Sequence, residues 1–215
     1  MYRQVSSEAS ILQTNSYLKH LDDLFITLTG LDEYTSPYAK MISNQQDYAR
    51  EIIKEACWKT GALSGTLSLP PGPFGILSLL PELLLTFKLQ GKLVKDIASI
   101  YGKESECKKE ILLYCLFNDL NKEILKDVIQ EVGWKVVVRP VSLKMYQNIL
   151  EKLGLASLRV VAKKTSGRWV PLLGAIFSGG MTYLETKHVG ERAMKIFSGE
   201  IIIENGETKE IFEVK

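Results

Sequence analysis

The sequence predicts a mostly α-helical protein: a multi-helix bundle around two long, apolar, glycine-containing helices, with a small β-hairpin at its C-terminal end. Three observations support this fold class. Apolar residues recur at helical spacing along most of the chain. Two segments, residues 73–102 and 169–184, are largely apolar and contain glycine. The hydrophobic period changes to that of strands only at residues 200–214.

The N-terminal half should form three helices. Apolar residues at helical spacing mark the first over 12–28. Ser43-x-x-Gln46 is a capping box, which predicts a second helix to about Thr60, and residues 61–75 then read as loop. The third helix should extend to Tyr101, because Gly102 suits the positive φ at the position that follows a helix.

The next stretch is predicted with less regular structure. A helix should begin near Glu104, and residues 119–132 continue it or form a separate helix ended by Gly133. Residues 136–140 are strand-like, although Pro140 blocks extension of a central strand. Shorter helices over 142–164 then lead to the last long helix, 169–197.

The C-terminal residues are typical of a hairpin. Asn205-Gly206 is a type I′ turn signal between strand-like residues 200–204 and 207–214. A lone hairpin is marginal in water, so we expect it to dock on the helical body. The predicted organisation is a helical domain over 1–198 and a hairpin appendage over 199–215.

Neither apolar segment is a comfortable membrane span. A spanning helix needs about 20 consecutive apolar residues. The first segment is interrupted by Glu82, and the second, between Arg168 and Glu185, would be about 24 Å long as a helix. We therefore expect both to be buried against each other as a packed central hairpin, with the membrane as a surface to visit and not to cross.

Composition limits the class of function. The chain has 215 residues, 46% of them hydrophobic and 24% charged, and its net charge of +2 does not indicate a globally basic nucleic-acid binder. The N-terminal residues lack the apolar region of a signal peptide. The three cysteines have no Cys-x-x-Cys spacing and fit buried side chains in a reducing compartment. We expect a cytoplasmic protein that associates peripherally with the inner face of the membrane.

Charge is unevenly distributed along the chain. Residues 134–168 contain one acid, Glu151, and eight basic residues: Lys135, Arg139, Lys144, Lys152, Arg159, Lys163, Lys164 and Arg168. This pattern indicates an anionic partner or a solvated basic face. Because leucines interleave with the cations, few aromatics are free to stack on bases, and anionic lipid headgroups explain the stretch better than nucleic acid.

Short motifs in both apolar segments resemble those of the EcsC family. In the first segment they are Pro-Gly-Pro before the helix, Pro81 with a following acid, Gln90, and the ending Ile97-Ala98-x-x-Tyr101-Gly102. In the second they are Val170-Pro171-x-x-Gly174-Ala175, Gly179-Gly180, and Ala193 before Phe197.

The resemblance covers residues 45–198 and leaves the hairpin outside the family core. It departs from the family at Glu82, where an aspartate is expected. This bacterial family is predicted to be helical and is named for a protein encoded beside an ABC transporter. The resemblance implies accessory or regulatory work near membranes, with no chemical activity to carry over.

Four polar residues of the first apolar segment are candidates for ligand binding: Glu82, Gln90, Asp96 and Tyr101. On a continuous helix Glu82 and Asp96 would lie about 21 Å apart, too far for paired acid and base catalysis, which needs about 5 to 10 Å. The alternative is structural: Glu82 as a partner of the helix dipole, and Gln90 and Tyr101 as buried groups that fix helix register. No nucleophile motif, phosphate loop or paired metal motif is present, so we expect no catalytic residue, metal or cofactor.

Three functions remain open. The first is a non-catalytic accessory protein that acts at an anionic membrane surface or on a membrane protein, with Lys163, Lys164 and Arg168 as the headgroup or partner contacts. The second is an immunity-like protein that neutralises or regulates a protein partner through the hairpin of residues 199–215. The third is an enzyme for a small molecule or lipid, with a pocket near Glu82, Gln90 and Tyr101 that requires a break at Pro81.

Overall fold

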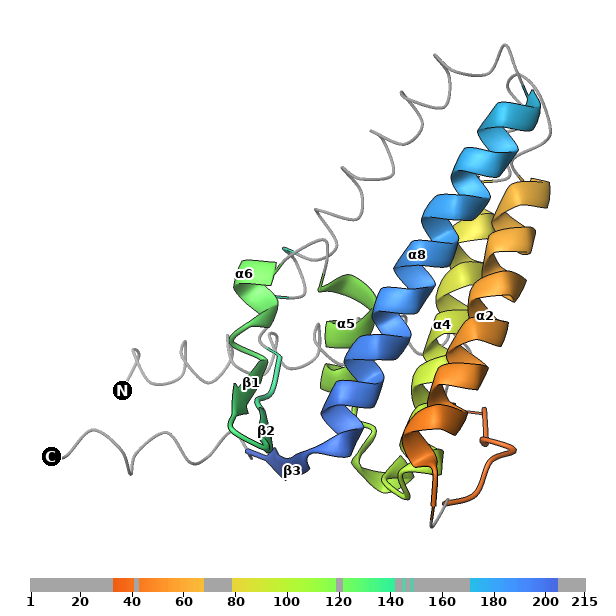
Figure 1. Cartoon of the computed structure of the whole chain (residues 1–215). Helices are drawn as coiled ribbons and strands as arrows, with labels where there is room; N and C mark the ends of the chain where they lie inside the picture. The colour runs from red at the N-terminus through yellow and green to blue at the C-terminus, as the bar shows by residue number, and fades with distance from the viewer. Residues whose placement is uncertain are drawn as a thin grey trace, which may run out of the picture.

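The computed structural model describes residues 33–40, 43–67, 79–118, 122–141, 145, 148 and 171–204. Its main body is a bundle of three long helices, α2 (Gln45–Leu67), α4 (Leu79–Ile100) and α8 (Pro171–Ser198), which pack against one another (Figure 1). A short 3₁₀ turn (Glu104–Glu106) and helices α5 (Lys109–Phe117) and α6 (Lys122–Leu125) follow α4. The predicted mostly α fold with a small β element is confirmed.

A three-stranded sheet lies at one end of the bundle, beside the C-terminus of α8 (Figure 1). Strand β1 (Ile129–Val132) pairs antiparallel with β2 (Lys135–Val138), and β3 (Glu200–Ile203) pairs parallel with β2. Because β3 follows α8 after one residue, this sheet anchors the end of the helix to the rest of the fold. We call the opposite end of the bundle, residues 60–67, 79–87 and 171–184, the distal end.

The apolar core occupies the sheet end of the bundle. Ile53 of α2, Ile97 of α4 and Phe197 of α8 are buried there together with side chains of α5 and the sheet. Cys57 and Cys115 are free thiols buried in this region, as their apolar surroundings in the sequence predict. The sheet end therefore has the ordinary polarity of a globular domain, with apolar residues inside.

Helix α2 is longer than its sequence predicts. The predicted loop begins at Gly61, yet the helix continues to Leu67. Gly61 faces Gly179 of α8: a Cβ added to Gly179 would lie 2.7 Å from the carbonyl oxygen of Gly61. The glycines of α8 thus permit close approach to α2, whereas the sequence predicts α4 as its close partner. The loop prediction was wrong for residues 61–67, because it treated a packing glycine as a helix breaker; residues 68–75 lie outside the described residues.

The end of α4 follows its prediction. Gly102 has φ +70°, and the amides of Gly102 and Lys103 donate to the carbonyls of Ser99 and Ala98, each at 2.8 Å. This is the Schellman pattern, which satisfies the last carbonyls of a helix. The helix runs unbroken from Leu79 to that point.

The region before α8 contains more strand than predicted. Residues 129–132 form β1 and not a helix, because they pair with β2 across a turn at Gly133, whose φ is +64°. Strand β2 ends at Val138, before Pro140 can interrupt the ladder. Of the predicted C-terminal hairpin, residues 200–203 form β3 on the body; its turn and second strand lie outside the described residues.

The Gly61–Gly179 contact makes a stability prediction. Gly179→Ala should lower the free energy of unfolding by about 1 to 3 kcal/mol, because the added methyl group overlaps the α2 backbone. Urea denaturation measures the change. Gly180→Ala is the matched control: nothing lies within 4 Å of its added Cβ, so removing an exposed helical glycine should stabilise by about 0.5 to 1 kcal/mol. Equal effects at both positions would contradict the packing.

Candidate functional site

The interior of the distal half of the bundle is polar. Polar residues recur every four positions on each helix, which places them on one helical face. Eight such side chains are buried between the three helices, and we call them the polar column: Thr60, Ser64, Glu82, Thr86, Gln90, Ser178, Thr182 and Thr186.

The layer of the column nearest the distal tip surrounds Glu82. The Ser64 hydroxyl donates to Glu82 Oε1 at 2.5 Å, and the Ser178 hydroxyl lies 3.3 Å from the same oxygen. The two serine oxygens are 2.8 Å apart. One carboxylate in the first turn of α4 therefore joins all three helices.

The layer nearest the sheet is a directed chain of hydrogen bonds. Gln90 Nε2 donates to the Thr186 hydroxyl at 3.1 Å, and the Thr186 and Thr60 oxygens are 2.8 Å apart. Thr60 in turn donates to the carbonyl of Ala56 at 3.0 Å. The predicted role of Gln90 as a buried group that fixes helix register agrees with this geometry.

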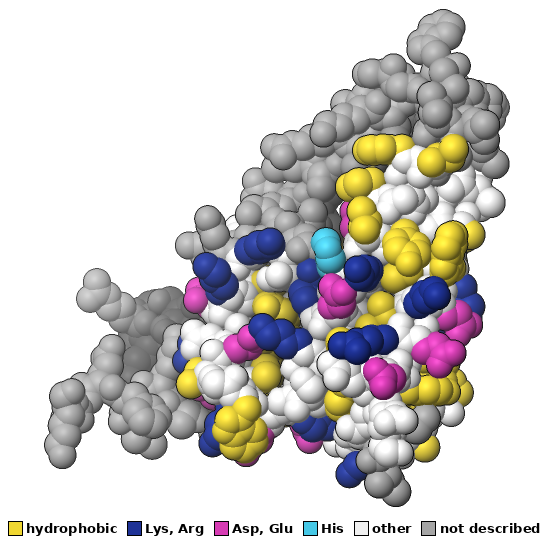
Figure 2. Space-filling model, viewed as in Figure 1, with side chains coloured by type: hydrophobic (Ala, Val, Ile, Leu, Met, Phe, Trp, Pro, Cys, Tyr) yellow, Lys and Arg dark blue, Asp and Glu magenta, His cyan; other side chains and the backbone are white. Residues whose placement is uncertain are grey.

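The outside of the same region is apolar. Figure 2 shows hydrophobic side chains over the distal half of the bundle and charges gathered nearer the sheet. The exposed apolar side chains of α2, α4 and α8 form what we call the apolar surface: Trp58, Leu85, Ile176, Phe177, Met181 and Leu184. With polar residues inside and apolar residues outside, the distal half has the reverse polarity of the sheet end.

Exposed charge is missing from this end of the described chain. Residues 60–67, 81–87 and 171–184 contain one ionisable carboxylate, Glu82, and that residue is buried. Charges resume at Lys88 on α4 and Glu185 on α8. Among the described residues, no helix is long and apolar enough to cross a membrane.

Asp96 lies in a separate cluster on the outer side of α4. Its Oδ1 accepts hydrogen bonds from the Tyr34 hydroxyl at 2.8 Å and the Ser36 hydroxyl at 2.7 Å. Lys95 donates to the Tyr34 carbonyl at 3.1 Å, and the Lys92 ammonium lies 4.7 Å from the centre of the Tyr34 ring. These contacts fasten residues 33–40 to α4. Burial raises the pKa of Asp96, against the lowering effect of the two hydroxyl donors.

The structure therefore distributes the candidate ligand-binding residues along α4. Glu82 and Gln90 belong to the polar column, at different layers. Asp96 holds the 33–40 segment, and Tyr101 is half-buried beyond the end of the helix, against the apolar core. Because α4 is continuous, it does not have the break at Pro81 that an enzyme pocket joining Glu82 and Tyr101 requires.

Part of the basic stretch is paired with the acidic C-terminal residues. The parallel register of β2 and β3 places Lys135 next to Glu200, at 3.9 Å, and Arg139 next to Glu204, at 3.0 Å. These exposed pairs contribute little stability individually, but they account for cations that the sequence assigns to a partner. Lys163, Lys164 and Arg168 lie outside the described residues.

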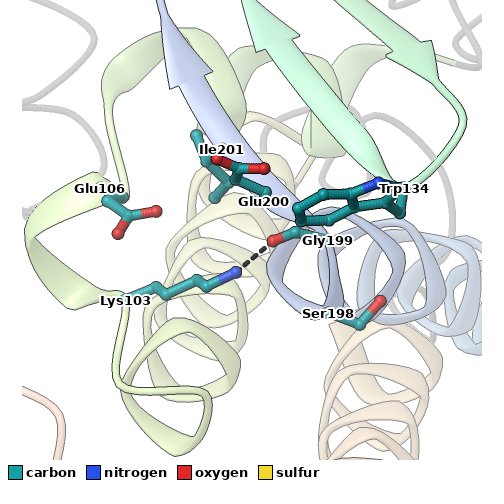
Figure 3. A pocket seen from close by; sticks show the side chains of 7 residues that line it. All are labelled: Lys103, Glu106, Trp134, Ser198, Gly199, Glu200 and Ile201. Carbon is teal, nitrogen blue, oxygen red and sulfur yellow. Dashed lines mark hydrogen bonds between the residues drawn. The ribbon is translucent and has the colours of Figure 1, made fainter.

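A small hollow lies where α8 meets the sheet. Its volume is about 340 Å³, and it is lined by Lys103, Glu106, Trp134, Ser198, Gly199, Glu200 and Ile201 (Figure 3). Inside it, the Lys103 ammonium donates to the Gly199 carbonyl. Lys103 is therefore held by the backbone at the start of β3, and the hollow offers no pair of convergent catalytic groups.

Sequence reasoning missed most of the polar column. It identified Glu82 and Gln90 but none of their partners on α2 and α8. The signal that finds them is the four-residue spacing of Ser and Thr, at 60 and 64 and at 178, 182 and 186, within otherwise apolar or small residues. The described residues contain no group of three or more His, Cys, Asp or Glu side chains that could hold a metal ion.

The Tyr34–Asp96 bond predicts an alkaline loss of stability. Burial and the neighbouring carboxylate raise the pKa of Tyr34 above its ordinary value of 10.0. The folded state therefore keeps this proton more tightly than the unfolded state, and stability falls as the pH rises above about 10. Tyr34→Phe should remove part of that fall and cost about 1 kcal/mol at pH 7.

Urea denaturation between pH 7 and pH 11 measures both effects. Tyr48→Phe is the control, since the Tyr48 hydroxyl makes no hydrogen bond within the described ranges. If the Tyr34→Phe and wild-type proteins lose stability in parallel above pH 10, the bond to Asp96 is not the source.

Comparison with known proteins adds no assignment: no family model, curated protein or solved structure matches the chain.

Proposed function

We propose that this protein is a non-catalytic, EcsC-like accessory protein that associates peripherally with a membrane through its distal end. The observation that carries the proposal is the reversed polarity of that end. An exposed apolar surface of several large side chains commonly marks a protein or membrane contact. Beneath this surface, buried hydroxyl groups hold the helices together by hydrogen bonds. Such bonds remain effective in contact with lipid, where apolar side chains are solvated as well by lipid tails as by a protein core.

The length of the apolar surface fits shallow insertion. From Ile176 to Leu184 the rise along α8 is about 12 Å, close to the roughly 15 Å of hydrocarbon in one leaflet. Glu185 and Lys187 then begin the charged part of the helix, at the level expected for headgroups. Because the whole distal end of α8, from Pro171 to Leu184, is about 20 Å long, the helix would lie tilted, with its apolar side turned to the lipid and within one leaflet.

The basic residues before α8 suit the same arrangement. Lys163, Lys164 and Arg168 precede Pro171 by a few residues, so the chain leads from them directly into the distal end of α8. We propose that they contact anionic headgroups with α8 lying tilted along the membrane surface, because an upright insertion would carry residues next to Pro171 into the hydrocarbon. Each cation near an anionic surface contributes about 1 kcal/mol, and salt screens this attraction.

Replacing Phe177 by Asp tests the membrane contact. The Phe177 side chain is 71% exposed, so the change should leave the fold intact. It should weaken binding to vesicles of phosphatidylglycerol and phosphatidylcholine at least about tenfold, because an inserted aromatic contributes about 1.5 to 3 kcal/mol. Vesicle co-sedimentation at low and high salt measures the partition.

Trp134→Asp is the matched control. Trp134 is a similarly exposed aromatic at 69%, but it lies in the β1–β2 turn at the sheet end. Equal losses for the two variants, or a wild-type protein that ignores vesicles at every salt concentration, would refute the proposal. A wild-type dimer that Phe177→Asp converts to a monomer, without vesicle binding, would assign the apolar surface to a protein contact.

A second candidate function is capture of a protein partner by the C-terminal strand. It is favoured by the position of β3 at the edge of the sheet, where Ile202 and Ile203 are partly exposed. An edge strand can accept a further strand from a partner. The acidic residues Glu200, in β3, and Glu204, just after it, pair with Lys135 and Arg139. The acidity of the C-terminal residues therefore does not by itself define the partner.

Deletion of residues 199–215 tests this second function: it removes β3, so pull-down of a protein partner should be lost while the helical fold remains, and an unchanged pull-down would refute capture by the strand. Truncation after Glu204 asks a different question, whether the residues beyond β3 contribute to vesicle binding. This truncation keeps β3 paired with β2, so the midpoint of thermal unfolding should change little. Loss of vesicle binding on truncation would assign membrane contact to residues 205–215 and contradict the role of the distal end. Unchanged vesicle binding is the outcome expected from the apolar surface.

A further inference from the structure

Strand β3 has a free edge. In the sheet order β1-β2-β3, β2 covers one side of β3, and no other described strand covers the opposite side. The amides of Glu200 and Glu204 donate to carbonyl oxygens on the β2 side, at 3.0 and 2.9 Å. Because successive residues of a strand direct their backbone groups to alternate sides, the amides and carbonyls of Ile201 and Ile203 face the free edge. This edge is therefore a template for a further strand.

A tight turn at Asn205-Gly206 would not cover this edge with the chain's own residues. A two-residue turn is closed by a hydrogen bond between the residues on either side of it, so the Glu204 carbonyl would have to face the returning strand. In an extended strand the amide and the carbonyl of one residue point to the same side. The Glu204 amide donates to β2, which favours an outside strand at the free edge.

The outward face of β3 determines which strand fits there. Glu200, Ile202 and Glu204 share this face, since side chains two residues apart point the same way. Their neighbours on β2 are a basic, an apolar and a basic residue: Lys135, Val137 and Arg139. The Glu200 and Glu204 side chains remain 46% and 42% exposed beside those cations. A second strand with the same basic–apolar–basic pattern is therefore complementary to the free side of β3.

The hollow described above lies at the start of this edge. Figure 3 shows Lys103 and Glu106 on one side of β3 and the strands β1 and β2 on the other. The Lys103 ammonium donates to the Gly199 carbonyl, so the edge is closed before Ile201. The carboxylates of Glu106 and Glu200 both line the hollow, whose volume is about 340 Å³. A basic side chain of an added strand would enter this space.

We propose that the free edge of β3 binds an extended segment of a partner protein that carries a basic, an apolar and a basic residue at alternate positions. The segment pairs with the backbone of Ile201 and Ile203 and places its basic side chains beside Glu200 and Glu204. The pattern is the same in both chain directions, so it fits a parallel or an antiparallel strand. This inference rests on the second candidate function, capture of a protein partner, and adds the chemistry of that partner.

A short peptide tests the preferred pattern. The probe is a fluorescein-labelled peptide that repeats residues 135–139 of β2, Lys-Val-Val-Val-Arg, between glycines. The reference peptide has glutamate in place of the lysine and the arginine. At low salt the full-length protein should bind the basic peptide at least about tenfold more tightly, because like charges on neighbouring strands repel, and added salt should reduce the difference. Fluorescence anisotropy measures both affinities.

Two substitutions at Ile203 test pairing through the backbone. Ile203→Pro removes an amide that faces the free edge and leaves the hydrogen bonds between β3 and β2 in place, and proline is tolerated at such edge positions. It should weaken binding of the basic peptide at least about tenfold. Ile203→Thr is the matched control: it also changes the side chain but keeps the amide, so it should keep most of the binding.

Four outcomes would overturn the proposal: a wild-type protein that binds neither peptide, equal affinity for both peptides, equal binding by the two Ile203 variants, and binding that appears only after truncation at Glu204. The last would assign the edge to residues 205–215. Failure of the pattern is distinct from failure of partner capture. A partner that is lost on deletion of residues 199–215, together with equal affinity for the two peptides, would keep capture by β3 and refute the basic–apolar–basic pattern.

Discussion

The close approach of α2 to α8 at Gly61 and Gly179 is the constraint on which the rest of the bundle depends. Side-chain hydroxyl groups are short, so they can bond across two helices only where the backbones nearly touch. The Thr60–Thr186 and Ser64–Ser178 bonds, each 2.8 Å, lie on either side of that contact. A methyl group at Gly179 would lie 2.7 Å from the Gly61 carbonyl oxygen, so the helices would have to move apart and both bonds would be strained.

The polar column in turn fixes the register of α4. Buried hydroxyl and amide groups have few acceptable partners, unlike apolar side chains, which tolerate small shifts. Glu82 must meet Ser64 and Ser178 while Gln90 meets Thr186, two turns further along. Both sets of hydrogen bonds form together at only one rotation of α4 about its axis and one position of α4 along that axis. The apolar sheet end provides stability, and the polar distal end provides specificity of packing.

The sequence predicts the fold better than it predicts the site, and particular residues show why. The end of a helix depends on local chemistry, so the end of α4 at Gly102 could be predicted from the sequence around it. Gly61 could not, because whether a glycine ends a helix or packs against another depends on a residue far away in the chain. Strand β1 was missed for the same reason: its apolar residues fit a helix until β2 and the Gly133 turn are considered. Glu82 and Gln90 stand out in an apolar segment, but their serine and threonine partners are individually common residues.

The structure gives Glu82 a different role from the one that the sequence indicates. In the sequence its charge argues against a membrane span, because a carboxylate is costly in hydrocarbon. In the folded protein it is turned inward and bonded by two serines, so its presence does not make the outer surface of α4 polar. The first exposed charges beyond it are Lys88 on α4 and Glu185 on α8. They lie where the apolar surface ends, so the lipid contact that we propose would be limited by these charges and not by Glu82.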